Sequence, residues 1–323
     1  MKLRDTVLAL IAFCAAAAPF AGFAQQPEKM FRIGWLSSQP PATPGTAYRG
    51  GAFVKRLSEL GYIEGKHYEF VVRLGNGDTG KLPALADELV RAKVDVIVAS
   101  GDLAADAVRD KRIPVVATTC QPFEAVSKLA RDGLNLTGIT CMTMELAPKR
   151  FELFKQVVPR ARRLAVLHTP NQRYGGLEIL HEQAKVFGLV LEPIAVPDAA
   201  ALEGALASIA RNRPDGITHQ PSQVLAREFQ RMADFALKEK LPMVGPFSEL
   251  AKFGGLITYG AAGPELPNTA ADQTARIFKG AMAREMPIEQ ARNIVLTINL
   301  KTAKALGITI PQSLLVRADE VIQ

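Results

Sequence analysis

Few residue patterns in this 323-residue chain are spaced for covalent chemistry. The glycine-rich segment 75–80 lies between a predicted strand and a helix, but a lone glycine pattern is a weak signal, and a polar turn is the better interpretation. No G-x-S-x-G sequence provides a nucleophile elbow. Asp102 and Asp106, one helical turn apart, could form a carboxylate pair, although acids often lie at a helix start because they favour its dipole. We therefore expect no catalytic residue and no cofactor, and hence not an enzyme.

The cysteines and histidines give no metal-ligand pattern. There is no Cys-x-x-Cys motif, and the four histidines are scattered along the chain. Cys120 and Cys141 can pair in an oxidising compartment, which closes a modest loop, or can be two small buried apolar residues. The sequence leaves these alternatives open and predicts no metal site.

Three aromatic residues follow predicted strand-end loops, where they can stack on a ligand or pack at a cleft rim: Tyr48, Tyr174 and Phe247. Arg173 lies in a similar loop and can clamp a carboxylate through two hydrogen bonds, or is a solvated loop arginine. Together these residues predict a cleft of moderately aromatic character.

Polar residues gather where predicted strands end, and in open α/β sheets ligands bind outside the carboxyl ends of the strands. In the first half the candidate ligand contacts are Ser37, Ser38, Ser100, Gly101, Asp102, Thr119 and Gln121. In the second half they are His168, Asn171, Gln220, Ser222, Phe247 and Ser248. Several of these ends open into helices, whose free N–H groups suit a carboxylate or another anion.

The elements that must position these residues are short apolar strands alternating with amphipathic helices. Strands are predicted at 33–36, 70–72, 94–98 and 115–117, and the apolar spacing within 82–90 predicts a helix that buries one face. Apolar strands separated by helices indicate parallel sheets covered on both sides. Trp35 lies inside a predicted strand and is expected in the core.

The same order of landmarks occurs twice. Segments 32–38, 60–62, 94–98 and 112–116 are echoed by 163–169, 187–189, 214–218 and 240–244. One match can arise by chance in any α/β chain, but four in order predict two similar lobes. The predicted fold is therefore α/β, with two Rossmann-like lobes of parallel sheets joined by a hinge and a ligand between them.

The N-terminus has the pattern of a signal peptide. Lys2 and Arg4 precede an apolar run from Val7 to about Phe23, and small residues precede a predicted cleavage after Ala24. The run is short for a membrane anchor, and Cys14 follows Phe13 rather than the small residue that lipidation requires. The formal charge of +7 comes from lysines and arginines that alternate with acids, as on solvated helix faces, so nucleic acid is not an expected partner.

Several motifs resemble a known family. They are Arg32-Ile33-Gly34 with Leu36-Ser37, Leu60-Gly61-Tyr62 with Glu64-Gly65-Lys66, Leu82 to Ala86, Val94 to Val98, Leu136-Thr137-Gly138, Gly254-Gly255-Leu256 with Tyr259-Gly260, and above all the tail 298–311 with 314–322. The chain resembles the ABC-transporter periplasmic substrate-binding proteins that include tryptophan and phenylalanine binders, over essentially all of its length after the signal segment.

The resemblance implies a type I periplasmic-binding fold with the ligand between the lobes. Carried over by position, it adds Tyr259 to the candidate contacts and supports Ser37, Ser100, Gly101, Thr119, Asn171, Gln220 and Ser248. The chain departs from the family at 168–171, where Asn-Pro is common, and at 220–222, where Asp-Pro is usual. These departures leave an aromatic amino acid as one ligand among others.

The sequence thus predicts a periplasmic solute-binding component of an ABC importer, which captures a small polar or amino-acid-like solute and delivers it to a membrane permease with its ATPase. An exported α/β hydrolase or isomerase, or a ligand-sensing module, is the alternative. A monomer is expected. The expected parts are a signal peptide at 1–24, an N-terminal lobe at 30–143 plus about 262–290, and a C-terminal lobe at 144–261 plus about 291–323.

Overall fold

The computed structural model describes residues 29–39, 51–131, 134–170 and 176–323. The chain divides into two units, residues 1–30 and Phe31–Gln323, and the architecture below is that of the second unit. Within the described residues, no helix is long and apolar enough to cross a membrane.

The first lobe is built on a six-stranded sheet whose pairings are all parallel. In spatial order its strands are β11 (Ile288–Gln290), β5 (Leu136–Thr140), β4 (Val115–Thr119), β3 (Val96–Ser100), β1 (Phe31–Ser37) and β2 (Tyr68–Leu74). Parallel strands end at one edge, so the residues that follow β1, β3 and β4 come close together.

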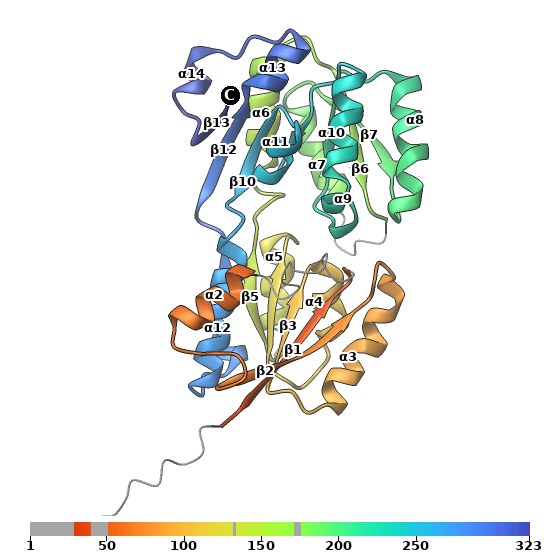
Figure 1. The fold of residues 1–323 in the computed structure, drawn as a ribbon. Coiled ribbons are helices and arrows are strands. Elements are labelled where there is room, and N and C mark those ends of the chain that lie inside the picture. The colour runs from red at the N-terminus through yellow and green to blue at the C-terminus, as the bar shows by residue number, and fades with distance from the viewer. Residues whose placement is uncertain (1–28, 40–50, 132–133, 171–175) are drawn as a thin grey trace, which may run out of the picture. The chain divides into compact units, whose positions relative to one another are not determined.

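Helices cover both faces of this sheet because its strands are apolar on both sides. Ile97 and Ala99 pack in one core cluster with α3 (Leu82–Arg91), α4 (Asp102–Val108) and α5 (Phe123–Arg131). Val96 and Val98 face the opposite way and share a core cluster with Trp35 and with residues of α2 (Gly51–Glu59) and α12 (Glu265–Phe278). These two helices lie side by side (Figure 1). The period-two alternation of β3 thus sorts its side chains between two cores, and Trp35 is buried as expected.

The second lobe contains two smaller sheets. One has the parallel order β7 (Val190–Ala195), β6 (Arg163–His168) and β8 (Gly216–His219). The other has the order β13 (Glu320–Ile322), β12 (Ile294–Asn299), β10 (Ile257–Ala261) and β9 (Val244–Gly245), with β10 and β12 antiparallel. A parallel bridge between Ile217 and Met243 links the two sheets.

The remaining helices and turns surround these sheets. The α-helices are α6 (Ala147–Val157), α7 (Gly176–Lys185), α8 (Leu202–Asn212), α9 (Gln223–Arg227), α10 (Phe229–Lys238), α11 (Ser248–Phe253), α13 (Leu300–Leu306) and α14 (Gln312–Leu315). Short 3-10 helices are η1 (Thr79–Lys81), η2 (Ala199–Ala201) and η3 (Ala283–Glu285). The glycine-rich segment 75–80 is a turn leading into η1, where the Asp78 side chain accepts a hydrogen bond from the Gly80 N–H.

Three segments connect the sheets of the two lobes: β5 to α6, β10 to α12, and β11 to β12. Cys141, Ala261 and Ala291, one from each segment, pack in a single small cluster. The Ala291 N–H donates to the Thr140 carbonyl over 2.9 Å, and the Ala262 N–H donates to the Asn293 carbonyl over 2.8 Å. The three connections therefore lie side by side, while the lobe boundaries expected from the sequence stay a prediction.

A disulfide joins Cys120, which follows β4, to Cys141, at the start of the first connection. The sequence left open whether these two cysteines pair or are small buried apolar residues, and in the structure they pair. The bond ties the loop that leaves one strand end to the segment that leads into the second lobe.

The repeated landmarks correspond to real elements. The predicted strands 33–36, 70–72 and 115–117 lie within β1, β2 and β4, and 94–98 overlaps β3. Segment 163–169 contains β6, and segment 214–218 overlaps β8. The α/β fold with two lobes of largely parallel sheet is confirmed. The antiparallel pair β10–β12 is an addition that the repeat pattern did not indicate.

Candidate ligand-binding site

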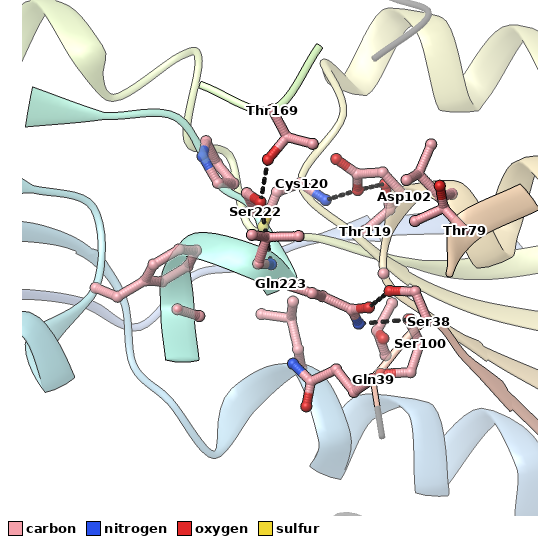
Figure 2. Close-up of a pocket in the computed structure, with 18 of the residues that line it drawn as sticks. Ser38, Gln39, Thr79, Ser100, Asp102, Thr119, Cys120, Thr169, Ser222 and Gln223 are labelled. Atoms are coloured by element: carbon pink, nitrogen blue, oxygen red, sulfur yellow. Dashed lines mark hydrogen bonds between the residues drawn. The ribbon is translucent and has the colours of Figure 1, made fainter. Parts of the chain in front are cut away.

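A cavity of about 410 Å³ lies at the strand ends of both lobes (Figure 2). The first-lobe wall consists of Ser38, Gln39, Thr79, Ser100, Gly101, Asp102, Leu103, Thr118, Thr119 and Cys120. The second-lobe wall consists of Thr169, Pro221, Ser222, Gln223, Val224, Ala226 and Phe247. Gly263, just before α12, and Leu266, in the first turn of α12, complete the lining. The volume is within the range of pockets for small metabolites.

Asp102 gives the first-lobe wall a carboxylate held in place by its neighbours. It is the first residue of α4, and Gly101 before it turns the chain with a φ of +95°, a conformation that favours glycine. Its Oδ1 accepts hydrogen bonds of 2.6 Å from the Thr119 hydroxyl and 2.6 Å from the Cys120 N–H. The ends of β3 and β4 thus share one acidic group.

Burial is the main cause that raises the pKa of Asp102 above its ordinary value, and repulsion from Asp106 acts in the same direction. The hydrogen bonds from Thr119 and Cys120 favour the ionised form and oppose this shift. A cationic group next to such a buried carboxylate would stabilise its ionised form. Asp102 and Asp106 are therefore not only acids that favour the dipole at a helix start, because Asp102 lies in the cavity wall.

Ser222 organises the second-lobe wall. Its side chain caps α9 by accepting from the Val224 and Leu225 N–H groups, and its hydroxyl lies 2.5 Å from that of Thr169. This arrangement fixes the backbone of Gln223, whose side chain extends to the first lobe. There Gln223 Nε2 donates to the Ser100 carbonyl over 2.7 Å, and its Oε1 accepts from the Ser38 hydroxyl (Figure 2).

A much smaller cavity of about 20 Å³, room for a single water molecule, adjoins Asp102. Gln121 and Gln220 line it together with Asp106, Met144 and the first residue of α7, Gly176. Gln121 Nε2 lies 3.5 Å from both the Asp102 carbonyl oxygen and Asp106 Oδ1, so these contacts are weak at best.

Two buried ionisable side chains of the second lobe, His219 and Arg150, are outside the cavity lining. The His219 ring packs against Phe229 and Phe247, and burial lowers its pKa to about 4, with a further contribution from the charge of Arg150. Arg150, on α6, donates to the carbonyls of Thr143, in the first lobe connection, and of Tyr259, within β10. Burial lowers the pKa of Arg150 to about 9, so it stays protonated at neutral pH.

The sequence-predicted contacts divide into four groups. Those on the cavity walls are Ser38, Ser100, Gly101, Asp102, Thr119, Ser222 and Phe247. Gln121 and Gln220 line the small cavity. Outside both cavities lie Ser37, His168, Ser248 and Tyr259. Tyr48, Asn171 and Tyr174, with Arg173, are outside the described residues.

The four residues outside the cavities have identifiable positions. Ser37 is buried at the end of β1, and its hydroxyl accepts from the Gln39 N–H. Tyr259 packs against the core of the second lobe. His168 ends β6 and Ser248 begins α11. Neither His168 nor Gln220, the two family departures, is on the wall of the larger cavity.

The wall also contains residues that the sequence did not indicate as ligand contacts, among them Gln39, Thr79, Thr169, Gln223 and Leu266. A signal existed for Gln223, because the Ser222 cap predicts a helix that begins there and turns its first side chain outward. Thr79 comes from the turn after β2, and Leu266 comes from α12, far along the chain. No local pattern connects either of them to a ligand site.

Comparison with known proteins identifies the class of site. The sequence profile of the family described as ABC transporter substrate binding protein matches residues 42–322. The chain belongs to this family. Substrate-binding proteins of this kind bind small solutes, work with ABC permeases, are typically extracellular or periplasmic, and are not enzymes.

Individual relatives agree with this assignment. A tyrosine-binding protein of Clostridioides difficile is 22% identical over 261 residues, which cover 79% of this chain and 75% of the relative. A conserved domain protein of Vibrio cholerae has a TM-score of 0.82 at 25% identity, covering 91% of this chain and 100% of that chain. An ABC domain from Streptococcus pneumonia, solved with L-Trp, has a TM-score of 0.80 at 23% identity over the same shares. The expected family and fold are confirmed.

The family assignment answers the alternative of a hydrolase or isomerase, because substrate-binding proteins of this family bind solutes and are not enzymes. The described lining of the larger cavity offers hydroxyls, amides and one carboxylate, which are groups that can bind a solute.

Proposed function

We propose that this substrate-binding protein captures a small amino-acid-like solute between its lobes, with Asp102 binding the ammonium group, and delivers it to an ABC permease in the inner membrane. In this proposal the chain is exported, the signal peptide is removed after Ala24, and the mature protein acts as a monomer. The lobes extend over 30–143 plus about 262–290 and over 144–261 plus about 291–323.

The charge of the cavity carries the proposal. Asp102 is the one ionisable side chain that the described lining of the larger cavity contains, and Asp106 lines the adjoining small cavity. An ammonium group bound to Asp102 would compensate a carboxylate that burial otherwise disfavours. A phosphate or a dicarboxylate would meet the same carboxylate with repulsion. The lining therefore favours a solute with a positive group.

Neutral polar groups and apolar surface fit the rest of such a molecule. Hydroxyls of Thr79, Thr119 and Ser222 can donate to or accept from a solute carboxylate without adding charge. Phe247 and Leu266 supply apolar surface for a side chain. A cavity of about 410 Å³ has room for a large amino acid, and amino acids are what the names of two relatives record for those proteins.

The test is a thermal-shift and calorimetric screen of the purified mature protein with matched solutes. Free aromatic and aliphatic L-amino acids are expected to raise the melting temperature, because a ligand at a hundred times its Kd adds about 2.7 kcal/mol of stability. The N-acetyl derivative of the best ligand retains the side chain and carboxylate but lacks the cation. We expect it to bind at least tenfold more weakly, since a charged partner of Asp102 is lost. Equal binding of the two compounds would contradict the role of Asp102, and absence of binding by all of these solutes would contradict the amino-acid class.

A further inference from the structure

Gln223 makes the only side-chain hydrogen bonds between the two walls that involve described residues of the larger cavity. Both Nε2 and Oε1 of the Gln223 side-chain amide form hydrogen bonds to the first lobe. The Nε2 group donates to the Ser100 carbonyl, 2.7 Å away at the end of β3, and Oε1 accepts from the Ser38 hydroxyl just after β1. Strands β1 and β3 are neighbours in the sheet, so one amide bridges two adjacent strand ends.

The glycine before Asp102 makes room for this amide. A Cβ atom on Gly101 would lie 2.5 Å from Gln223 Nε2 and 2.8 Å from its Cδ, which is closer than real contacts allow. The φ of +95° at Gly101 independently favours glycine. The first-lobe wall therefore has a slot in which the glutamine side chain fits.

The second lobe presents Gln223 from a fixed position. Ser222 caps α9 directly before it, and the Ser222 hydroxyl is in turn paired with Thr169 after β6. A side chain whose backbone is held in this way loses less freedom when it forms a bond across the cleft. The two hydrogen bonds of Gln223 to Ser100 and Ser38, the bridge between the walls, involve no solute atom, so the bridge can form before a solute is bound.

The bridge leaves the binding space open. The cavity of about 410 Å³ lies beside Gln223, with the amide as part of its lining. Asp102 accepts its hydrogen bonds from Thr119 and Cys120 rather than from Gln223, so its carboxylate is not engaged by the bridge. The glutamine therefore holds the walls together without occupying the place of a solute.

We propose that Gln223 is a positioning residue that links the two lobes and sets solute affinity by increasing the population of the binding-competent arrangement. The inference rests on the proposed capture of a solute between the lobes. When only a fraction of molecules is competent, the apparent Kd is the intrinsic Kd divided by that fraction. Loss of the bridge reduces the fraction and raises the apparent Kd.

The experiment combines calorimetry with small-angle X-ray scattering on the mature protein, with and without the amino acid that binds best. Q223A removes both hydrogen bonds and should raise Kd about tenfold, as expected for two neutral hydrogen bonds. The radius of gyration without solute should increase, and saturating solute should return it to the wild-type value. Q223E keeps the side-chain size but places a carboxylate oxygen against the Ser100 carbonyl, so it should resemble Q223A.

A matched control is Q230A, because Gln230 is on α10 of the same lobe and bonds within that helix to Asp234. It should leave both the radius of gyration and Kd unchanged. If Q223A raises Kd without changing the radius of gyration of the solute-free protein, Gln223 is a ligand contact and the proposal is wrong. An unchanged or lowered Kd also overturns it. If the wild-type protein binds no amino acid, the scattering comparison without solute still tests the bridge, so the two proposals fail separately.

Discussion

The two walls of the cavity are built from similar βα units but differ in charge and attachment. The first-lobe wall contains Asp102, supported by donors from the end of β4, and a disulfide ties its Cys120 to the first lobe connection. The described second-lobe wall carries no charged side chain, and its polar groups cap a helix or extend across the cleft. The buried His219 packs against its Phe247 from behind.

Under the proposed function, this difference gives the lobes separate tasks. A charge kept near a cavity is costly to bury, so it needs fixed donors, and the first lobe supplies them through Thr119 and Cys120. The first lobe would then bind the charged end of the solute, and the described second-lobe wall, which carries no charge, would close over it.

The largest effect is expected from D102N. The variant keeps the shape and an oxygen that can accept from Thr119 and Cys120, but it removes the negative charge. Loss of one partner of a buried charge pair weakens binding by about 2–5 kcal/mol, on the order of 30-fold or more. Calorimetry with the amino acid that binds best measures this loss, and binding within threefold of wild type would break the contrast between the walls.

The pH dependence of binding sharpens the same point. Burial raises the pKa of Asp102, so its ionised form is lost at a less acidic pH than for an exposed aspartate. Wild-type affinity should therefore fall as the pH is lowered through that raised pKa, while the weak binding of D102N should lack this dependence. D106N is the matched comparison, because Asp106 lines the small cavity only and should retain most of the affinity.

The sequence was a good guide to the first-lobe wall for a physical reason. Ser100, Gly101 and Asp102 directly follow a strongly apolar strand, and parallel strands bring such ends to a common edge. Ser37 and Ser38 show the limit of that argument. Adjacent residues of an extended chain point to opposite sides, and only Ser38 is on the cavity wall.

The second-lobe wall was less accessible to sequence reasoning. Gln223 belongs to it because a capped helix directs its side chain to the other lobe, which is a tertiary relation. His168 ends a strand, as the predicted contacts of the first lobe do, yet it is outside both cavities. The repeat thus predicted the fold of both lobes, whereas the identity of the wall residues depends on how each strand end turns.

The disulfide is a second difference between the two walls, because the described second-lobe wall has no covalent bond of this kind. The double variant C120A/C141A removes a bond that closes a loop with a sequence separation of 21 residues. For a loop of this length the free energy of unfolding should fall by about 3 kcal/mol. Urea unfolding measures the change, and the reduced wild-type protein should match the variant, while added reductant should leave the variant unaffected. An unchanged unfolding free energy would show that the tie does not stabilise the first lobe.

The smallest expected effect is the contribution of His219 to the pH dependence of the unfolding free energy. Its sign is opposite to that of the contribution of Asp102. The pKa of His219 falls from an ordinary 6.5 to about 4 because the ring is buried, so the folded protein binds fewer protons than the unfolded chain in that range. Its contribution to stability is present above pH 6.5 and is lost as the pH falls toward 4, and between pH 7 and pH 5 the loss is about 2 kcal/mol. Asp102 acts in the other direction, because a carboxyl with a raised pKa favours the folded state on acidification.

The variant that tests this contribution is H219L, which keeps an apolar side chain behind Phe247 but cannot take up a proton. The unfolding free energy of H219L should fall less steeply than that of wild type between pH 7 and pH 5. The unfolding free energy of D102N should fall more steeply than that of wild type over any part of this range in which Asp102 titrates. Chemical unfolding at a series of pH values measures the three profiles. Identical slopes for wild type and H219L would mean that His219 is already accessible to protons in the folded protein. Opposite changes in the two variants would show that burial, the property that raises the pKa of Asp102 in the first lobe, also makes His219 in the second lobe a source of acid destabilisation.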